Sequence, residues 1–237
     1  MKHIAIIGAS GGIGAAFIES LLKRDETQRI YAFSRSGSDF TDERVENLDI
    51  DITSADSVEG ASQHINAPLD LVIIATGLLH DGDKMQPEKS IRNIERDNFE
   101  ASYLVNTIGP ALVGKYFLPK MNKDGRAVFA ALSARVGSIS DNEVGGWYAY
   151  RASKAALNMV LKNFAIEMGR RHKELVIAAL QPGTVDTDLS KPFQGNVAND
   201  KLFTPAYSAE KLLDVLAGID PQNSGKLFDW AGSIIDP

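Results

Sequence analysis

The chain has 237 residues, of which 44% are hydrophobic and 24% charged, and these values exclude an intrinsically disordered or collagen-like protein. With 25 basic and 31 acidic residues the net charge is −6, so we expect neither nucleic acid nor an anionic membrane as a partner. The lack of cysteine excludes a disulfide framework, a thiolate metal site and a cysteine nucleophile, and it predicts a cytoplasmic protein.

Short apolar runs alternate with helical patterns along the whole chain. The runs predict strands at Ile4–Ile7, Ile30–Phe33, Leu48–Ile52, Leu71–Ala75, Ala127–Leu132, Leu175–Leu180 and Lys226–Phe228. Between them, apolar residues recur at helical spacing, as in Ile13, Phe17 and Leu21. This alternation predicts one α/β domain over residues 1–237, with a doubly wound parallel sheet of about seven strands and helices on both faces.

A glycine-rich turn, residues 8–14, follows the first strand directly and opens a helix. Glycines let a backbone approach a pyrophosphate closely, and a helix N-terminus offers free N–H groups to it. The glycine spacing fits two registers, Gly8-Gly12-Gly14 and Gly8-Gly11-Gly14. The turn therefore predicts a Rossmann fold that binds a dinucleotide through Gly8, Ser10, Gly11, Gly12, Ile13 and Gly14.

The ends of the second and third predicted strands indicate which dinucleotide binds. An acidic residue after the second strand would bind the ribose 2′-hydroxyl of NAD(H), and an arginine would accept the 2′-phosphate of NADP(H). The chain has Ser34 and Arg35 there and no carboxylate, which favours NADP(H) over NAD(H). Asp51 and Ile52 end the third predicted strand, where a carboxylate can accept from the adenine amine; Asp49 is the rival residue.

Two polar segments, Leu78–Ser90 and Asp188–Pro205, are long for loops, and long loops in compact domains tend to be functional. The first contains His80-Asp81-Gly82-Asp83, which lacks the remaining ligand pattern of a metal loop. The four histidines are scattered without metal-ligand spacing, so we expect no metal site. Residues 188–205 are the candidate substrate loop.

Tyr150 and Lys154 are four residues apart, so on a helix their side chains share one face. A nearby ammonium stabilises phenolate, and we therefore expect Lys154 to lower the pKa of Tyr150. A phenol with a lowered pKa can exchange a proton with a carbonyl or an alcohol near neutral pH.

The glycine turn and the tyrosine–lysine pair together resemble the short-chain dehydrogenase/reductase family in its classical form, over essentially the whole chain. Residues 133–139 and 145–154 look most like the subgroup of the C-factor and Sniffer-type carbonyl reductases. The resemblance implies that Asn106 holds a helix distortion and completes a proton relay, and that Lys154 holds the nicotinamide ribose. It also implies that the segment after the sixth strand contacts the cofactor through Pro182, Gly183, Val185 and Thr187.

Two places depart from the family pattern. After the fourth strand the family usually has Asn-Asn-Ala-Gly, and this chain has Ile74 followed by Ala75, Thr76 and Gly77, which we still expect beside the cofactor. The second departure concerns the catalytic serine, because strict register puts Ala134 in its place. We expect Ser133 to take the role, ahead of Ser138.

The resemblance implies an NADP(H)-dependent oxidoreductase that transfers hydride between nicotinamide and a small carbonyl or secondary alcohol substrate. Tyr150 would act as general acid and base, and Ser133 would donate to the carbonyl oxygen. By family habit we expect a homodimer or homotetramer. The alternative is a dinucleotide-binding sensor or C-factor-like signalling protein with weak catalysis, which the two departures would favour.

Overall fold

An eight-stranded sheet forms the centre of the computed structural model, which describes residues 1–82 and 84–237. The strands run in the order β10-β9-β6-β5-β4-β1-β2-β3, and all pairs are parallel except β10 with β9. The bounds are β1 His3–Ile7, β2 Arg29–Ser34, β3 Val45–Asp49, β4 Leu71–Ile74, β5 Ala127–Leu132, β6 Leu175–Gln181, β9 Lys226–Asp229 and β10 Ile234–Ile235. The predicted doubly wound α/β sheet is confirmed; the antiparallel edge strand β10 was missed.

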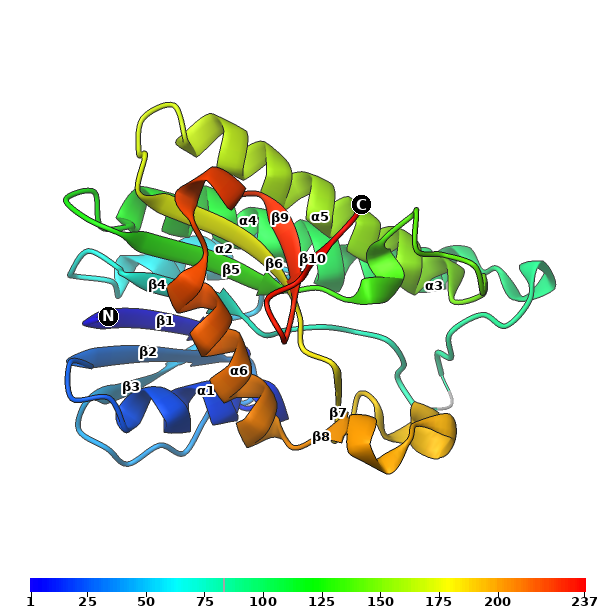
Figure 1. The fold of residues 1–237 in the computed structure, drawn as a ribbon. Helices are drawn as coiled ribbons and strands as arrows, with labels where there is room; N and C mark the ends of the chain where they lie inside the picture. The colour runs from blue at the N-terminus through cyan, green and yellow to red at the C-terminus, as the bar shows by residue number, and fades with distance from the viewer. Residues whose placement is uncertain (83) are drawn as a thin grey trace.

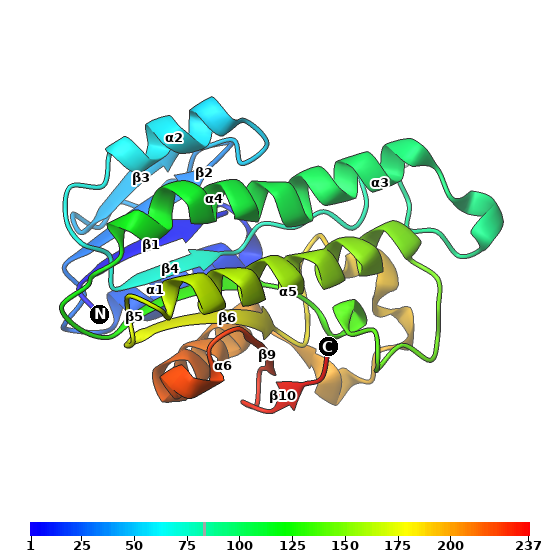
Figure 2. The same cartoon turned by 90° about the horizontal axis from the view of Figure 1, so that it is seen from above.

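Helices cover both faces of the sheet (Figure 1; Figure 2). On one face α1 (Gly12–Leu22) packs with α6 (Pro205–Gly218), and their core includes Phe17 and Leu212. The other face carries α2 (Ala55–Gln63), α4 (Gly109–Phe117) and α5 (Tyr148–Met168), with a second core that includes Phe117 and Leu161. Among the described residues, no helix combines the length and hydropathy that a membrane span needs.

The third strand lies earlier in the chain than predicted. We predicted it over Leu48–Ile52, but β3 covers Val45–Asp49 and pairs only with β2, at the edge of the sheet. Ile50 and Ile52 are buried as loop residues that pack into the core under the sheet. Their apolar side chains were therefore mistaken for strand residues, and Asp51 lies in the loop after β3 instead of at its end.

The direction of strand order reverses between β1 and β4, because β2 and β3 lie to one side of β1 and β5 to the other side of β4. Loops that leave neighbouring strands at such a point run apart, and they leave a crevice at the carboxyl edge of the sheet. The glycine turn follows β1 and residues 75–77 follow β4, so both predicted cofactor segments meet at this crevice.

A second, two-stranded sheet of β7 (Thr184–Val185) and β8 (Leu202–Phe203) lies beyond the carboxyl end of β6. Between its strands, short 3₁₀ turns at Lys191–Asn196 and Asn199–Lys201 project from the body of the fold (Figure 1). The predicted substrate loop 188–205 therefore contains short regular elements, including β8, and its first residues border the crevice.

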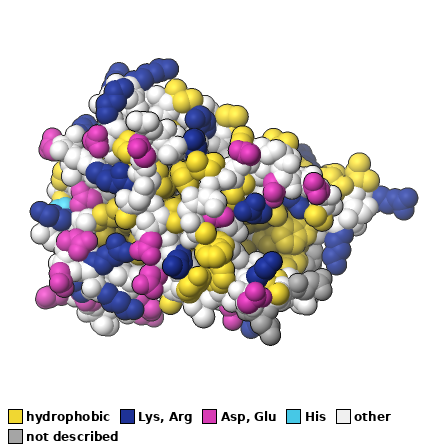
Figure 3. Space-filling model, in the orientation of Figure 1, with side chains coloured by type: hydrophobic (Ala, Val, Ile, Leu, Met, Phe, Trp, Pro, Cys, Tyr) yellow, Lys and Arg dark blue, Asp and Glu magenta, His cyan; other side chains and the backbone are white. Residues whose placement is uncertain are grey.

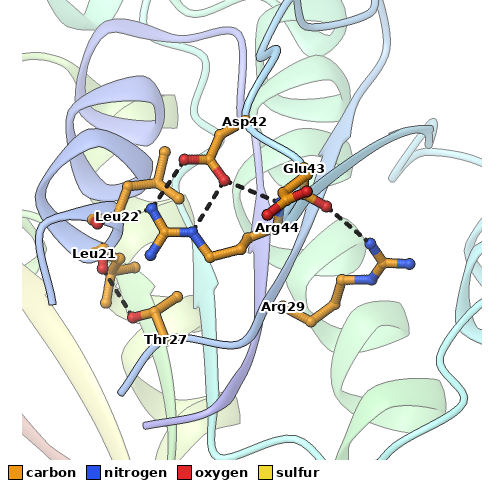
Figure 4. Close-up of polar contacts among 7 residues, drawn as sticks. All are labelled: Leu21, Leu22, Thr27, Arg29, Asp42, Glu43 and Arg44. Carbon is orange, nitrogen blue, oxygen red and sulfur yellow. Dashed lines mark hydrogen bonds and ion pairs between the residues drawn. The ribbon is translucent and has the colours of Figure 1, made fainter. Parts of the chain in front are cut away.

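At the opposite end of the sheet from the crevice, the arginine Arg44 joins the start of β3 to the end of α1 (Figure 4). Its guanidinium donates to both carboxylate oxygens of Asp42, at 3.0 and 2.9 Å, and to the carbonyl of Leu22 at 3.0 Å. The hydrogen bonds from Arg44 lower the pKa of Asp42 to about 2. Nearby, Thr27 donates to the carbonyl of Leu21 at 2.8 Å. These contacts fix the turns far from the crevice.

Candidate active site

The glycine turn after β1 is built for close backbone approach. Gly8 has φ +95°, and a Cβ there would lie 3.0 Å from the carbonyl carbon of Ala75. A Cβ on Gly14 would collide with the carbonyl oxygen of Gly8. The backbone N–H groups of Gly8 and Ala9 both donate to Phe33, at 2.8 and 2.9 Å, which ties the turn to β2. Side chains at positions 8 and 14 would open the turn.

Helix α1 begins at Gly12, and its N-cap residue, Gly11, has no side chain to bond the first turn. The first N–H groups of a helix have no partner within the helix, and they carry the positive end of its dipole. The N-terminus of α1 therefore presents donors to an anion, as a phosphate-binding turn does.

A cavity of about 450 Å³ extends from this turn across the carboxyl edge of the sheet. Most of the residues predicted to bind the cofactor line it, namely Gly8, Ser10, Gly11, Gly12, Ile13, Ser34, Arg35, Asp51, Ile52, Ala75, Thr76, Gly77, Tyr150, Lys154, Pro182 and Thr187. Ser133, Tyr150 and Lys154 place predicted catalytic groups at the same cavity.

Gly14, Gly183 and Val185, also predicted to bind the cofactor, do not line the cavity. Gly14 is buried against the turn, where it allows α1 to approach β1. Gly183 has φ +81°, and a Cβ there would lie 2.6 Å from the ring of Phe203, so its role is to form a tight turn. Val185 is buried in β7, and its carbonyl accepts from the hydroxyl of Ser190.

The cavity fits a dinucleotide, because it contains polar groups that the protein leaves without partners. The hydroxyl oxygens of Ser34 and Thr76 are buried and, within the described part of the chain, make no hydrogen bond. A buried hydroxyl without a partner is costly, and a polar ligand would satisfy both. Ser34 lies where an NAD(H)-binding fold would carry its acidic residue, and exposed Arg35 lies beside it.

Asp51 lies at the far end of the cavity, whereas its rival Asp49 is exposed and does not line it. The Asp51 carboxylate accepts from the hydroxyl and the backbone N–H of Thr53, at 2.7 and 2.9 Å. These hydrogen bonds, with a smaller contribution from the charge of Arg35, lower the pKa of Asp51. A charged acceptor is thus available at this end.

Tyr150 and Lys154 stand one above the other on the first turns of α5, as their spacing predicted. Both are almost fully buried, with 8% and 2% of their surfaces exposed. The Lys154 Nζ donates to the carbonyl of Leu132 at 2.9 Å, and it lies 5.7 Å from the centre of the Tyr150 ring. This bond aims the ammonium between the tyrosine and the end of β5.

The prediction that Lys154 lowers the pKa of Tyr150 does not hold for the protein alone. Burial raises the pKa of Tyr150 to about 12, and burial lowers the pKa of Lys154 to about 8. The cost of charging a buried phenol exceeds the attraction of an ammonium that is itself poorly solvated. Tyr150 is therefore held in its protonated form.

Asn106 lies in a π-helical turn, Leu104–Ile108, that joins α3 (Arg96–Tyr103) to α4. Its amide oxygen accepts from the N–H of Leu78 at 2.8 Å, and its amide nitrogen donates to the carbonyl of Leu78 at 2.8 Å and to the hydroxyl of Ser153 at 3.1 Å. The side chain does not line the cavity. Its contacts hold the helix distortion in register with α5 and with the loop after β4.

The two candidate serines have different surroundings. Ser133 follows β5 directly and lines the cavity, and its hydroxyl donates to the amide oxygen of Asn158 at 2.7 Å. Ser138 is buried away from the cavity, where its hydroxyl donates to the carbonyl of Asp236 and accepts from the N–H of Asp141. Of these two serines, Ser133 lines the cavity that Tyr150 lines, and Ser138 does not.

Aromatic rings continue the site beyond Tyr150. The Trp147 ring contacts Tyr150 edge-on at 6.2 Å between centroids, and it contacts Phe193 of the substrate loop at 5.1 Å. Phe193 in turn meets the ring of His80 at 5.7 Å. Figure 3 shows a hollow with hydrophobic side chains on the side where the substrate loop projects. The open end of the site is thus apolar and aromatic.

No cluster of three or more His, Cys, Asp or Glu suited to a metal ion occurs in residues 1–82 and 84–237. Asp83, the last residue of the His80–Asp83 segment for which we predicted no metal site, lies outside the described residues. Within that loop, the His80 ring meets the carbonyl of Asp188 at 3.2 Å, which joins the two long polar segments.

The family model described as short chain dehydrogenase matches residues 2–197. The chain belongs to this family. It is therefore an oxidoreductase of a kind that uses a nicotinamide dinucleotide and acts on small molecules, as the tyrosine–lysine pair and glycine turn predicted. The family assignment is independent of which residues carry the chemistry in this chain.

Two curated relatives extend the comparison. The 1-hydroxy-2-glutathionyl-2-methyl-3-butene dehydrogenase of Rhodococcus sp. (strain AD45) is 29% identical over 99% of both chains. The C-signal of Myxococcus xanthus is 31% identical over 144 residues, which are 61% of this chain and 81% of that protein.

Two solved structures share the fold. The NADPH-bound carbonyl reductase from chicken fatty liver has a TM-score of 0.85 at 24% identity, covering 100% of this chain and 99% of that one. The carbonyl reductase Sniffer of D. melanogaster has a TM-score of 0.84 at 20% identity, with complete coverage of both chains. Relatives of the C-factor and Sniffer type, which the sequence motifs predicted, are thus confirmed.

Some cavity residues escaped the sequence prediction: Ser36, Ile50, Thr53, Val105, Leu132, Asp188 and Leu189. Asp188 and Leu189 belong to the predicted substrate loop, and Leu132 ends a predicted strand, so their positions carried a signal. Val105 carried none, because it reaches the cavity from the π-helical turn.

Proposed function

We propose that this protein is an NADP(H)-dependent carbonyl reductase. The observation that most supports the proposal is that Tyr150, Lys154 and Ser133 line the same cavity as the glycine turn. A proton donor, a cation and a neutral hydroxyl then surround one end of the cavity, and donors suited to phosphate line the other. A carbonyl group at the first end would have what its reduction to an alcohol requires.

In the proposed reaction, Tyr150, Ser133 and Lys154 have separate roles. When bound, the nicotinamide dinucleotide supplies the hydride for reduction and accepts it in the reverse direction. Tyr150 donates its proton to the carbonyl oxygen and takes it back in oxidation. Ser133 would donate a hydrogen bond to the same oxygen, where negative charge develops, once its hydroxyl hydrogen turns away from the amide oxygen of Asn158. Lys154 would hold the nicotinamide ribose, and its charge would favour the phenolate left after proton transfer.

Asn106 acts in this proposal as a positioning residue. Its amide nitrogen donates to Leu78 and Ser153 and its amide oxygen accepts from Leu78, so its contribution is to hold the π-helical turn against α5. The predicted proton relay through Asn106 then requires its backbone or a water molecule near it.

The preference for NADP(H) rests on Arg35 and on the neutral Ser34 beside it. An exposed guanidinium can pair with a 2′-phosphate, and no carboxylate is present at the end of β2 to bind a free 2′-hydroxyl. The NADPH bound to the chicken carbonyl reductase supports the same choice.

The proposal is tested by fluorescence titration of wild type and Arg35→Ala with NADPH and NADH, followed by NADPH oxidation with a panel of ketones, aldehydes and quinones. We expect wild type to bind NADPH about tenfold or more tighter than NADH, and Arg35→Ala to lose most of that difference. Equal binding of both nucleotides by wild type would contradict the cofactor assignment, and an inert panel would contradict the reductase.

A dinucleotide-binding signalling protein is the second candidate. Ala134 at the expected serine position and the similarity to C-signal favour it. This second function predicts NADPH binding without turnover of any carbonyl compound.

We further propose that residues 1–237 form one domain and that copies of the chain associate as a homodimer or homotetramer. A cytoplasmic location stays a prediction from the lack of cysteine.

A further inference from the structure

Helix α5 carries Tyr150 in its first turn, but the residue before the helix does not cap it. The N-cap residue Trp147 makes no side-chain hydrogen bond to the first turn. Its backbone is left-handed, with φ 50° and ψ 44°, and the two preceding residues, Gly145 and Gly146, also have positive φ. A left-handed tryptophan is strained, so surrounding contacts must hold the start of this helix in place.

Glu88, from the loop after β4, supplies those contacts. One carboxylate oxygen accepts from the backbone N–H of Ala149 at 3.2 Å, and the other faces the amide nitrogen of Asn98 on α3 at 3.4 Å. The backbone carbonyl of Glu88 accepts from the N–H of Trp147 at 2.5 Å. One residue from a distant loop thus bonds both the N-cap residue and the second residue of α5.

Glu88 is only 2% exposed, and among the described residues no basic side chain forms an ion pair with its carboxylate. Burying a carboxylate without compensation is costly. The compensation here is the N-terminus of α5, whose free N–H groups and positive dipole end favour a negative group. A charged residue kept in such a place argues for a task that an apolar residue would not perform.

The position of Glu88 connects this task to the site. Ala149, whose N–H it accepts, directly precedes Tyr150 in the chain. Trp147, whose N–H it also binds, carries the ring that lies between Tyr150 and Phe193. The Glu88 loop also contains Leu78, which is bonded to Asn106. The start of α5, the π-helical turn and the aromatic wall therefore share one loop as their support.

We propose that Glu88 is a positioning residue, whose buried carboxylate caps α5 from another loop and thereby fixes Tyr150 and the Trp147 ring at the substrate end of the cavity. The inference rests on the proposed reductase function for its catalytic consequence. The cap itself does not depend on turnover, so the two parts can be tested separately.

The test compares Glu88→Ala and Glu88→Gln with wild type. Alanine removes the acceptor, whereas glutamine keeps an amide oxygen that can accept from Ala149. Glu95→Ala is the matched control, because Glu95 is an exposed carboxylate before α3 that makes no capping hydrogen bond. The measurements are hydrogen exchange of residues 147–150, NADPH affinity by fluorescence, and kcat and KM for a carbonyl compound that wild type reduces.

For Glu88→Ala we expect exchange in residues 147–150 to rise about tenfold or more and kcat to fall about tenfold or more. NADPH affinity should stay within about threefold, because the glycine turn does not contact Glu88. Glutamine should restore exchange and kcat to within about threefold of wild type, and Glu95→Ala should match wild type.

Unchanged exchange in Glu88→Ala would overturn the cap. Increased exchange with unchanged kcat would overturn the positioning role, as would equal losses of kcat, NADPH affinity and thermal stability, which indicate general destabilisation. If Glu88→Ala does not fold, Glu88→Gln decides alone: a tenfold loss of kcat with wild-type exchange would overturn the positioning role. If wild type reduces no carbonyl compound, the proposed function fails while hydrogen exchange still decides the cap.

Discussion

Tyr150 and Lys154 are both buried in a setting that disfavours their charged forms. Burial raises the pKa of Tyr150 to about 12 and lowers that of Lys154 to about 8. At neutral pH the phenol therefore carries its proton but is a weaker acid than a solvent-exposed tyrosine, while the lysine is kept charged at a cost to the fold. Catalytic groups often destabilise the protein that carries them.

This cost predicts a pH-dependent stability. The pKa of Lys154 is lowered from 10.5 to about 8, so between these values the unfolded chain binds a proton that the folded chain does not. The contribution of Lys154 to the free energy of unfolding therefore rises with pH. Between pH 7 and 9.5 we expect wild type to gain about 2 kcal/mol relative to Lys154→Met, measured by urea denaturation.

Lys162→Met is the control for this experiment, since Lys162 is an exposed lysine on the same helix. Its difference from wild type should not change with pH over this range. A constant difference between wild type and Lys154→Met would contradict the burial of a charged ammonium.

The two serines make a second prediction at this scale. Ser133→Ala should lower kcat by about 100-fold, because it removes a donor from the oxygen where charge develops. Ser138→Ala should change kcat by less than about threefold and lower the melting temperature, because its hydroxyl ties residues 236 and 141 together. Steady-state kinetics and thermal unfolding measure both effects, and the reverse pattern of kcat losses would assign the role to Ser138.

The position of a functional residue could be predicted from the sequence when it depends only on neighbours in the chain. The spacing of Tyr150 and Lys154 sufficed, because four residues make one helical turn. The effect of burial on the Tyr150 pKa was not predictable, because it depends on what covers the ring. The bonding of Asn106 to Leu78, 28 residues away in the chain, likewise appears only when the loop after β4 is placed.

Among the elements, the turn from β1 into α1 depends most on its glycines. Gly14→Ala should prevent NADPH binding and destabilise the protein by about 3 kcal/mol or more, because its Cβ would strike the carbonyl of Gly8. Gly60→Ala is the control, since Gly60 lies inside α2 with nothing within 4 Å of an added Cβ. It should be neutral or stabilising by up to about 1 kcal/mol. Normal NADPH affinity in folded Gly14→Ala would contradict this role for the turn.

Element prediction succeeded where periodicity and burial agree. The central strands, such as Ile4–Ile7, are buried on both faces and formed continuous apolar runs. The edge strand β3 is half-exposed, so Ile50 and Ile52 in the following loop gave the stronger apolar signal. The start of α5 carries a left-handed tryptophan and is held by Glu88, which lies 61 residues before Ala149 in the chain, so no local sequence pattern predicted its structure.

At the scale of the whole molecule, exposed apolar residues bear on the oligomeric state. Leu104, Ile108, Met159 and Ile166 are 38%, 46%, 62% and 51% exposed on the helices that lie side by side in Figure 2. We expect light scattering to give the mass of a dimer or tetramer and Met159→Glu to reduce it. Ile139→Glu, at a 77% exposed position outside these helices, should leave the mass unchanged. A monomeric wild type would contradict the homo-oligomer.

The proposed reductase depends most directly on the phenol of Tyr150. The decisive measurement is NADPH oxidation with the best carbonyl compound of the panel, by wild type and by Tyr150→Phe, alongside NADPH titration of both. We expect similar NADPH affinity and a loss of kcat by about 1,000-fold or more in the variant, because its proton donor is gone. Undiminished turnover by folded, NADPH-binding Tyr150→Phe would contradict the proposed reductase.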